Sequence, residues 1–205
     1  MTRLLAFVMA PMLMVGCAHA DGTAPSSEQK PVVQQPPAEA RDMSPAEAEA
    51  LADFKTRVDA YIKLQEAAQA RLPKMPEETT PQVIDTHQRA LEKLLTAERS
   101  QAKQGDILTP AVQKIFRAVL ARVFAGREGQ ELKATILDDN PGTMPLRVNA
   151  RYPDEVPLST VPPQVLSSLP TLPKSLEYRF VGERLVLLDN KAHTIVDYMN
   201  DAFPR

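Results

Sequence analysis

Residues 176–198, with the sequence LEYRFVGERLVLLDNKAHTIVDY, carry the clearest indication of a fold in the chain. Apolar and polar residues alternate from Leu176 to Phe180, as they do in a strand with one buried face. Gly182 and the tetrapeptide DNKA at residues 189–192 are turn signals that separate this segment from two further apolar runs. The stretch therefore predicts a three-stranded antiparallel meander. Because its middle run, RLVLL, is apolar on both faces, we expect that run to be the central strand, covered by another layer.

The region upstream of the meander is rich in proline, which excludes long helices there. Nine of the 19 prolines follow residue 140, and proline breaks the interior of a helix. Alternating segments at residues 132–136 and 146–150 predict a β-hairpin around the turn sequence DNPG. A short helix, capped by Thr160, is expected within residues 162–168.

Three helices are predicted between residues 44 and 127. The sequence SPAE at residues 44–47 combines an N-cap serine, a proline at the first helical position and the glutamate of a capping box. Threonine–proline pairs at residues 80–81 and 109–110 repeat this start. Apolar residues then recur at three- and four-residue steps, as in amphipathic helices. The third helix has the widest apolar face and is expected to be the most buried.

These elements predict an α+β fold. Two long antiparallel helices and a buried third helix come first, and a small antiparallel sheet follows. Short connections favour antiparallel packing of the helices. We expect the helical part, residues 44–127, and the proline-rich β part, residues 128–205, to form one globular unit.

The first sixteen residues predict an export signal. Arg3 precedes the apolar run LLAFVMAPMLMVG of 13 residues, whereas a membrane-spanning helix needs roughly 20. Cys17, the single cysteine, follows this run as the acylated cysteine does in bacterial lipoproteins. Since Ala18 and no aspartate comes next, we expect a lipoprotein of the outer membrane that faces the periplasm. Cleavage after Ala20, in the sequence AHA, is the alternative and would release a soluble periplasmic protein.

Residues 17–43 predict a disordered tether. They consist mainly of Pro, Gln, Ser, Ala and Glu and contain hardly any large apolar side chain. Such a segment cannot bury enough surface to offset the loss of chain entropy on ordering. Its prolines favour extended backbone, so the segment would hold a folded domain away from the membrane.

The composition excludes several classes of function. A net charge of −2 lacks the basic excess of nucleic-acid binders, so no nucleic-acid partner is expected. One cysteine permits neither an intrachain disulfide nor a cysteine zinc site. The chain has seven glycines and none of the common phosphate-loop, nucleophile-elbow or zinc-protease motifs. The sequence thus predicts no catalytic residue, no metal site and no cofactor.

Two histidines and several aspartates are the titratable residues for which the sequence offers a structural or a functional role. His87 falls on the apolar stripe of the second helix and is interpreted as a packed histidine with a hydrogen-bond partner, a ligand or base being the alternative. His193 lies at a turn and is expected to be solvent-exposed. Asp138 and its neighbours are interpreted as part of a turn. Asp189 and Asp197 flank the last hairpin, where turn and edge roles are the main interpretation and a facing pair for acid–base chemistry is the alternative.

Basic residues of the third helix give the one candidate contact surface, formed by Lys114, Arg117, Arg122 and Arg127. Such a face is ordinarily solvated. The functional alternative is contact with anionic lipid headgroups or lipopolysaccharide, or with an acidic partner. Strand packing could extend this face with arginines of the β part, namely Arg147, Arg151 and Arg179.

The C-terminal quarter resembles a group of exported bacterial proteins of unknown function. The resemblance covers residues 147–198 and is carried by V-N-x-x-Y-P, S-T-V-P, L-P-x-L-P and L-E-Y-R-F-x-G-x-x-L-V-L-x-D motifs. It implies export and no particular activity. The tyrosine-containing hairpin also resembles strand pairs of periplasmic nickel/cobalt-homeostasis proteins, but the chain lacks a histidine-rich or acidic cluster. The L-P-x-L-P segment is interpreted as a rigid connector, with a docking motif as the alternative.

Two functions follow from these features. The first is a non-catalytic envelope lipoprotein, anchored through Cys17, that acts as an interaction or scaffold module for another envelope protein. The alternative is a periplasmic small-ligand or metal-binding protein, or a hydrolase, that uses Asp, Arg and Tyr side chains of the β part. The alternative requires a pocket with converging polar groups near the meander.

Overall fold

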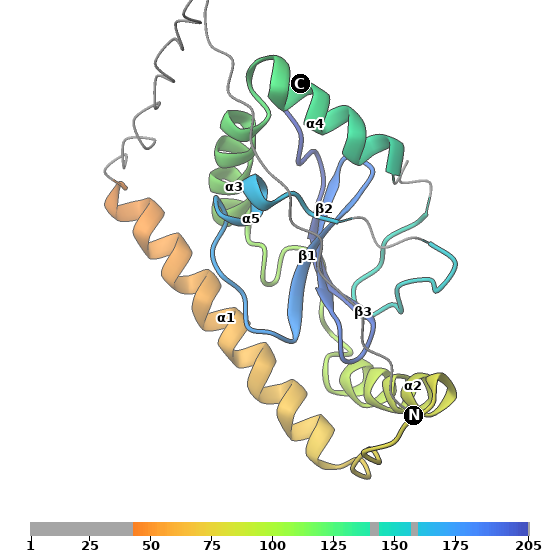
Figure 1. The fold of residues 1–205 in the computed structure, drawn as a ribbon. Helices are drawn as coiled ribbons and strands as arrows, with labels where there is room; N and C mark the ends of the chain where they lie inside the picture. The colour runs from red at the N-terminus through yellow and green to blue at the C-terminus, as the bar shows by residue number, and fades with distance from the viewer. Residues whose placement is uncertain (1–42, 140–143, 157–159, 205) are drawn as a thin grey trace, which may run out of the picture. The chain divides into compact units, whose positions relative to one another are not determined.

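The computed structural model describes residues 43–139, 144–156 and 160–204, which belong to one compact unit (Figure 1). The predicted signal, Cys17 and nearly all of the tether lie outside the described residues. The elements in chain order are α1 Pro45–Ala70, α2 Pro81–Glu98, α3 Pro110–Val123, α4 Gly126–Asp139, α5 Pro163–Leu166, β1 Leu176–Val181, β2 Arg184–Asp189 and β3 Thr194–Met199. The α+β class is confirmed.

The three strands form the predicted antiparallel meander in the order β1-β2-β3. Val181 pairs with Arg184 across a two-residue turn that contains Gly182 at φ 56°. A two-residue hairpin loop of this kind needs positive φ, which glycine adopts without a steric penalty. A bulge between Leu187 and Leu188 shifts the register of β2 against β3.

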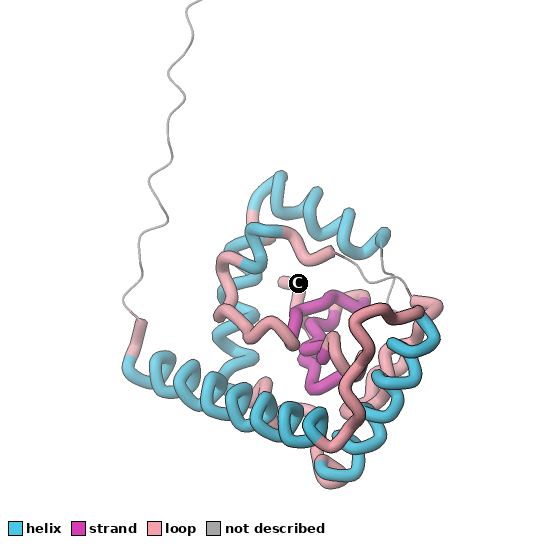
Figure 2. The backbone as a smooth tube through the Cα atoms, turned by 60° about the horizontal axis from the view of Figure 1, so that its bottom comes forward, coloured by secondary structure: helices cyan, strands magenta, loops and turns pink. Residues whose placement is uncertain are grey.

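Each face of the central strand β2 is buried in a different core. Leu185 and Leu187 pack with residues of α1 and α3. Val186 and Leu188 point to the opposite face and pack with Tyr152. Helices α1 and α3 accordingly lie on one side of the sheet and residues 144–156 on the other (Figure 1). In Figure 2 the strands lie in the middle, with helices and loops around them.

The predicted starts of the three main helices are confirmed. Ser44 and Glu47 form a complete capping box, with Pro45 as the first helical residue. Thr80 accepts a hydrogen bond from the Val83 N–H before α2. Thr109 precedes α3 without a side-chain capping bond.

Helix α2 is shorter than α1 and packs against only the last turns of α1. Leu91 and Leu95 join Ala68 in a small apolar cluster, and Arg71 at the end of α1 pairs with Glu98 at 2.8 Å. The earlier turns of α1 pack on α3 and the sheet instead. The first two helices therefore meet at one end and do not pack along their full lengths.

Residues 126–139 form helix α4, so the strand predicted at residues 132–136 is wrong. Ile136 is buried and Leu132 half-buried, whereas Ala134 is exposed. Four-residue spacing, and not alternation, is thus the period of this segment. Gly129 is required here, because a Cβ at this position would overlap the backbone of Phe124 at the end of α3. The helical part extends to residue 139.

The second strand of that predicted hairpin is also absent from the described residues. Asn149 adopts φ 65°, and residues 149–152 run along the edge of β3. They make backbone hydrogen bonds to it, including Asn149 N–H to the Ile195 carbonyl at 2.8 Å, and a single bridge from Arg151 to Thr194. The short helix expected before the meander is confirmed as α5, with Pro162 and not Thr160 in the N-cap position.

Candidate functional site

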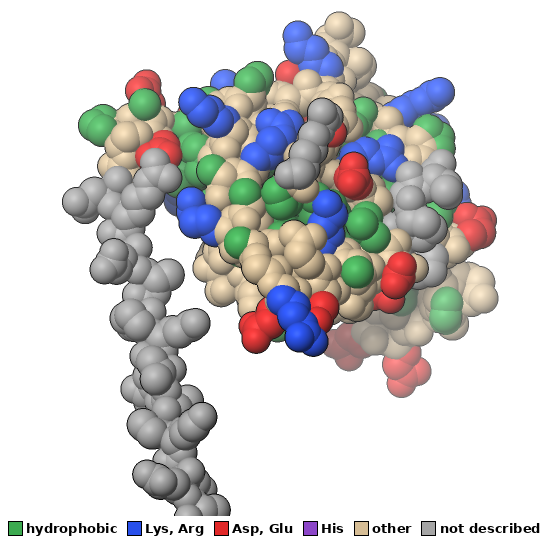
Figure 3. Space-filling view, turned by 90° about the horizontal axis from the view of Figure 1, so that it is seen from above, with side chains coloured by type: hydrophobic (Ala, Val, Ile, Leu, Met, Phe, Trp, Pro, Cys, Tyr) green, Lys and Arg blue, Asp and Glu red, His purple; other side chains and the backbone are tan. Residues whose placement is uncertain are grey.

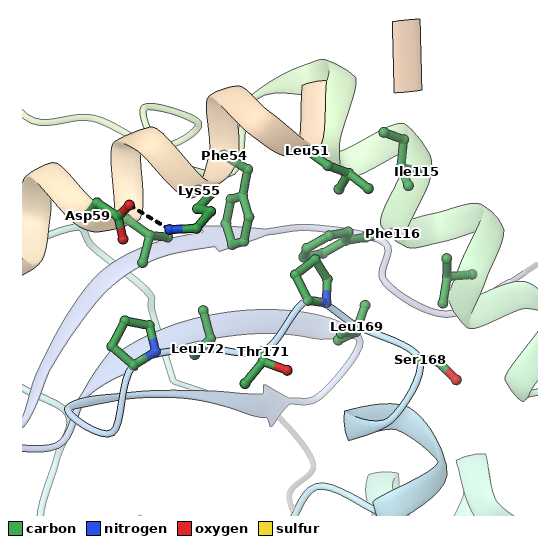
Figure 4. A pocket seen from close by; sticks show the side chains of 14 residues that line it. Leu51, Phe54, Lys55, Asp59, Ile115, Phe116, Ser168, Leu169, Thr171 and Leu172 are labelled. Carbon is green, nitrogen blue, oxygen red and sulfur yellow. Dashed lines mark hydrogen bonds and ion pairs between the residues drawn. The ribbon is translucent and has the colours of Figure 1, made fainter. Parts of the chain in front are cut away.

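The described surface contains an apolar groove of about 600 Å³ with three walls. Helix α1 forms one wall, helix α3 the second, and residues 168–173 the third (Figure 4). Its lining is dominated by leucine, isoleucine, valine, phenylalanine and proline side chains. We call this feature the apolar groove.

The two helical walls follow from the spacing of apolar residues. Leu51 and Val58 lie on one side of α1, and Ile115 and Val119 lie on one side of α3. Val58 is buried, but the other three are only half-buried. The apolar faces of the helices are therefore wider than their mutual contact can cover, and the excess borders the groove.

The third wall is the L-P-x-L-P segment. Leu169 is buried in the core, while Pro170, Leu172 and Pro173 face the groove. The Tyr178 hydroxyl on β1 donates to the Pro170 carbonyl at 3.1 Å, and the Leu176 N–H donates to Pro173. The segment thus connects α5 to β1, and it also forms one wall of the groove.

Aromatic rings make the floor of the groove rigid. The ring of Phe54 meets that of Phe116 edge-on at 5.5 Å between centroids, and Phe116 meets Tyr178 in the same way at 6.0 Å. All three side chains are almost completely buried. Burial also raises the pKa of Tyr178, which keeps its hydroxyl protonated as a hydrogen-bond donor.

Polar groups are confined to the rim of the groove. Lys55 and Asp59 pair with each other at 2.8 Å, with side chains 76% and 47% exposed. Ser168 and Thr171 are exposed on the opposite rim, and the Ser168 hydroxyl donates to the Gln164 carbonyl. The side chains of the floor therefore offer no hydrogen-bonding group, which suits hydrocarbon better than a polar ligand.

The four predicted basic residues do not form a single face. Lys114 and Arg122 are exposed on α3. Arg117 points elsewhere and donates to the carbonyls of Asn200 and Asp201. Arg127 belongs to α4 and pairs with Glu131 at 2.9 Å. Figure 3 likewise shows Lys and Arg side chains spread over the face seen from above and not gathered in one cluster.

The expected extension of this basic face is wrong for two of the three arginines of the β part, whereas the third, Arg147, is exposed. Arg151 is tied to Asp85 and Asp154 at 2.8 and 2.9 Å, with only 13% of its side chain exposed. Arg179 pairs with Glu177 on its own strand.

Asp189 and Asp197 are completely buried but do not face each other as a pair. Asp189 accepts from the Tyr61 hydroxyl at 2.6 Å, from Gln65, and from two backbone N–H groups of the following turn. Asp197 accepts from the backbone N–H groups of Gly105, Ile107, Leu108 and Tyr198. Each carboxylate is thus saturated by its own set of donors. The sequence indicated these aspartates but not their partners.

The environment of these carboxylates favours a structural role. Burial and the nearby charge of Asp189 raise the pKa of Tyr61, so its hydroxyl stays protonated. The Arg99 guanidinium lies 4.9 Å from the centre of the Tyr61 ring, and burial lowers the pKa of Arg99. None of these groups lines the apolar groove.

The two described histidines lie apart from the groove. His87 is half-buried on α2, as its predicted packing requires, but the expected hydrogen bond is missing at its buried Nε2, which has no partner among the described residues. The expected exposure of His193 is wrong, because its side chain is 17% exposed and its ring packs edge-on against Tyr152. Burial, followed by the charge of Arg151, lowers the pKa of His193. Asp138 and Asp139 are exposed in the last turn of α4, so their interpretation as part of a turn is wrong.

Metal-binding clusters and membrane-spanning helices are both absent from the described ranges. No group of three or more His, Cys, Asp or Glu residues there is placed to hold a metal ion. None of the helices in that part of the chain combines the length and hydropathy needed to cross a bilayer.

Comparison with known proteins gives no match to any family model, curated protein or solved structure. The resemblance of residues 147–198 to exported bacterial proteins therefore stays a prediction.

Proposed function

We propose that the protein is an exported, non-catalytic binding module, tethered to the membrane by acylation of Cys17, that holds the hydrocarbon chain of an envelope lipid in the apolar groove. Export and tethering are supported by the apolar run behind Arg3, the position of the single cysteine and the composition of residues 17–43. The ligand is supported by the groove itself.

The apolar floor of the groove is the observation that carries this proposal. Its volume of about 600 Å³ lies within the roughly 300–1,000 Å³ of small-molecule sites. Each methylene transferred there from water contributes about 0.8 kcal/mol. About eight buried methylenes would contribute roughly 6 kcal/mol before the entropic cost of ordering the ligand is subtracted.

A hydrocarbon chain fits these walls better than a peptide does. An extended peptide brings backbone N–H and C=O groups that need partners, and the floor has none to offer. A helix about 10 Å wide would insert only side chains into a cavity of this size. The predicted tether, residues 17–43, would keep the groove close to the membrane that supplies the lipid.

A hydrolytic function of the β part has less support. Its most conspicuous carboxylates, Asp189 and Asp197, are buried and saturated by hydrogen bonds. A carboxylate in that state has no lone pair directed toward a substrate. The non-catalytic proposal is therefore preferred.

Titration calorimetry with myristoyl lysophosphatidylcholine, below its micelle threshold, tests the proposal. This probe has a single hydrocarbon chain and no net charge. The chain from residue 18 onward retains every described residue and carries no acyl group of its own. Val119→Glu places a carboxylate on the groove wall and should weaken binding at least tenfold, because that charge must be desolvated when the chain enters.

Val83→Glu is the matched control. Val83 is 39% exposed on α2, away from the groove, and its substitution should leave binding unchanged. Circular dichroism would be used to verify that both variants are folded. Equal binding by the parent chain and a folded Val119→Glu variant would contradict the proposal, as would the absence of any binding to the parent chain.

A further inference from the structure

We infer that the apolar groove selects lipids with an anionic head group, which Arg122 and Lys114 of α3 hold beside the groove. This inference rests on the proposed function and names the class of lipid. The α3 wall carries the positive charges of Lys114 and Arg122, which no acidic side chain of that helix balances.

Helix α3 places its cations next to the groove by simple periodicity. Arg122 follows Val119 by three residues, so it lies on the same side of the helix, just outside the groove-lining row. Lys114 and Ala118 precede it at four-residue steps on the exposed surface. The small side chain of Ala118 leaves space between the two cations for a head group.

Both cations are available for a ligand. The α3 sequence PAVQKIFRAVLARV contains no acidic residue. Over the described ranges, no ion pair or side-chain hydrogen bond involves Lys114 or Arg122, in contrast to Arg117 and Arg127. The one carboxylate that lines the groove, Asp59, is already paired with Lys55. The α3 side of the groove is therefore positive.

The placement of charge fits an anionic amphiphile. A hydrocarbon chain in the groove leaves its head group at the rim, because the floor cannot solvate charge. A phosphate at the rim would lie within reach of the Arg122 guanidinium group and the Lys114 ammonium group. The occupant is thus one hydrocarbon chain of an anionic phospholipid. The test must distinguish this occupant from an acidic protein segment.

The test compares two lipids with the same myristoyl chain. Lysophosphatidylglycerol carries one net negative charge, whereas lysophosphatidylcholine carries none. The parent chain from residue 18 should bind the anionic lipid at least about fivefold more tightly at low salt, since each basic residue near an anionic lipid contributes about that factor and α3 supplies two. This preference should shrink at 0.5 M salt, because the charges are exposed.

The double variant Lys114→Gln/Arg122→Gln should bind both lipids equally, with the affinity that the parent chain shows for lysophosphatidylcholine. Lys93→Gln/Lys103→Gln removes two exposed cations outside α3 and should retain the full preference of the parent chain. Both doubles lose the same net charge.

The outcomes separate this inference from the proposed function. If the parent chain binds both lipids equally, head-group selection is overturned while groove binding stands. If the preference survives in the Lys114→Gln/Arg122→Gln variant, the assignment to α3 is overturned. If neither lipid binds but an acidic peptide does, both the inference and the lipid proposal are overturned.

Discussion

Residues 51–59 of α1 line the apolar groove, whereas its later turns carry polar side chains to a buried carboxylate. Leu51 is half-buried and borders empty space. Tyr61 and Gln65, on later turns, reach the buried carboxylate of Asp189. The saturated carboxylate of Asp189 joins α1 to the sheet, although the buried Oε1 of Gln65 has no hydrogen-bond partner among the described residues. The apolar groups that border the groove, in contrast, have incomplete contacts.

The largest effect on stability is expected at Asp197. Replacement by alanine removes the acceptor for four backbone N–H groups, among them those of Ile107 and Leu108 at 2.8 Å. An unsatisfied buried donor costs about 1–3 kcal/mol, so Asp197→Ala should lower the free energy of unfolding by about 3–5 kcal/mol. Urea denaturation measures this difference.

Two controls sharpen this comparison. Glu77→Ala, at an exposed position between α1 and α2, should change the free energy of unfolding by less than about 0.5 kcal/mol. Val119→Glu, on the half-buried groove wall, should cost less than Asp197→Ala. A larger cost for Val119→Glu would show that the groove wall is part of the core.

A smaller effect is expected at Tyr61. Tyr61→Phe removes the hydroxyl that donates to Asp189 at 2.6 Å and should destabilise by about 1–3 kcal/mol, since the hydrogen bond is to a buried charge. Tyr198→Phe is the matched control, because the Tyr198 hydroxyl donates to the neutral Leu146 carbonyl at 3.3 Å. A cost at Tyr198 equal to that at Tyr61 would contradict the special role of the carboxylate.

The same substitution has a pH signature. The folded-state pKa of Tyr61 is raised above its ordinary value of 10.0, so the native state holds this proton more tightly than the unfolded state. The resulting stability is fully present below pH 10 and declines above it, by up to about 1.4 kcal/mol per pH unit. Tyr61→Phe should flatten this decline in urea titrations between pH 9 and 11.

Local sequence patterns were sufficient to predict the meander and the helix starts. The capping box at Ser44 and the turn at Gly182 involve residues only a few positions apart. Helix α4 was missed because Leu132, Ala134 and Ile136 satisfy strand alternation, while Leu132 and Ile136 also satisfy a helical period. Only packing, which leaves Ala134 exposed, distinguishes the two.

The site itself depends on contacts between distant parts of the chain. Phe54, Phe116 and Leu172 meet at the groove from three separate elements, and Tyr61 lies 128 residues from Asp189. Periodicity identifies an apolar face but not what covers it. The L-P-x-L-P motif was the one sequence signal that pointed toward the third wall.

Methyl NMR during titration with myristoyl lysophosphatidylcholine tests the central claim most directly, that the apolar groove holds the hydrocarbon chain. The account predicts that the methyl signals of Val58, Ile115 and Val119 shift as lipid is added and stop shifting when the groove is fully occupied. Those of Val83 and Ile84, which are exposed apolar residues on α2, should stay in place. Shifts confined to Val83 and Ile84, or no saturable shift at the groove, would contradict it.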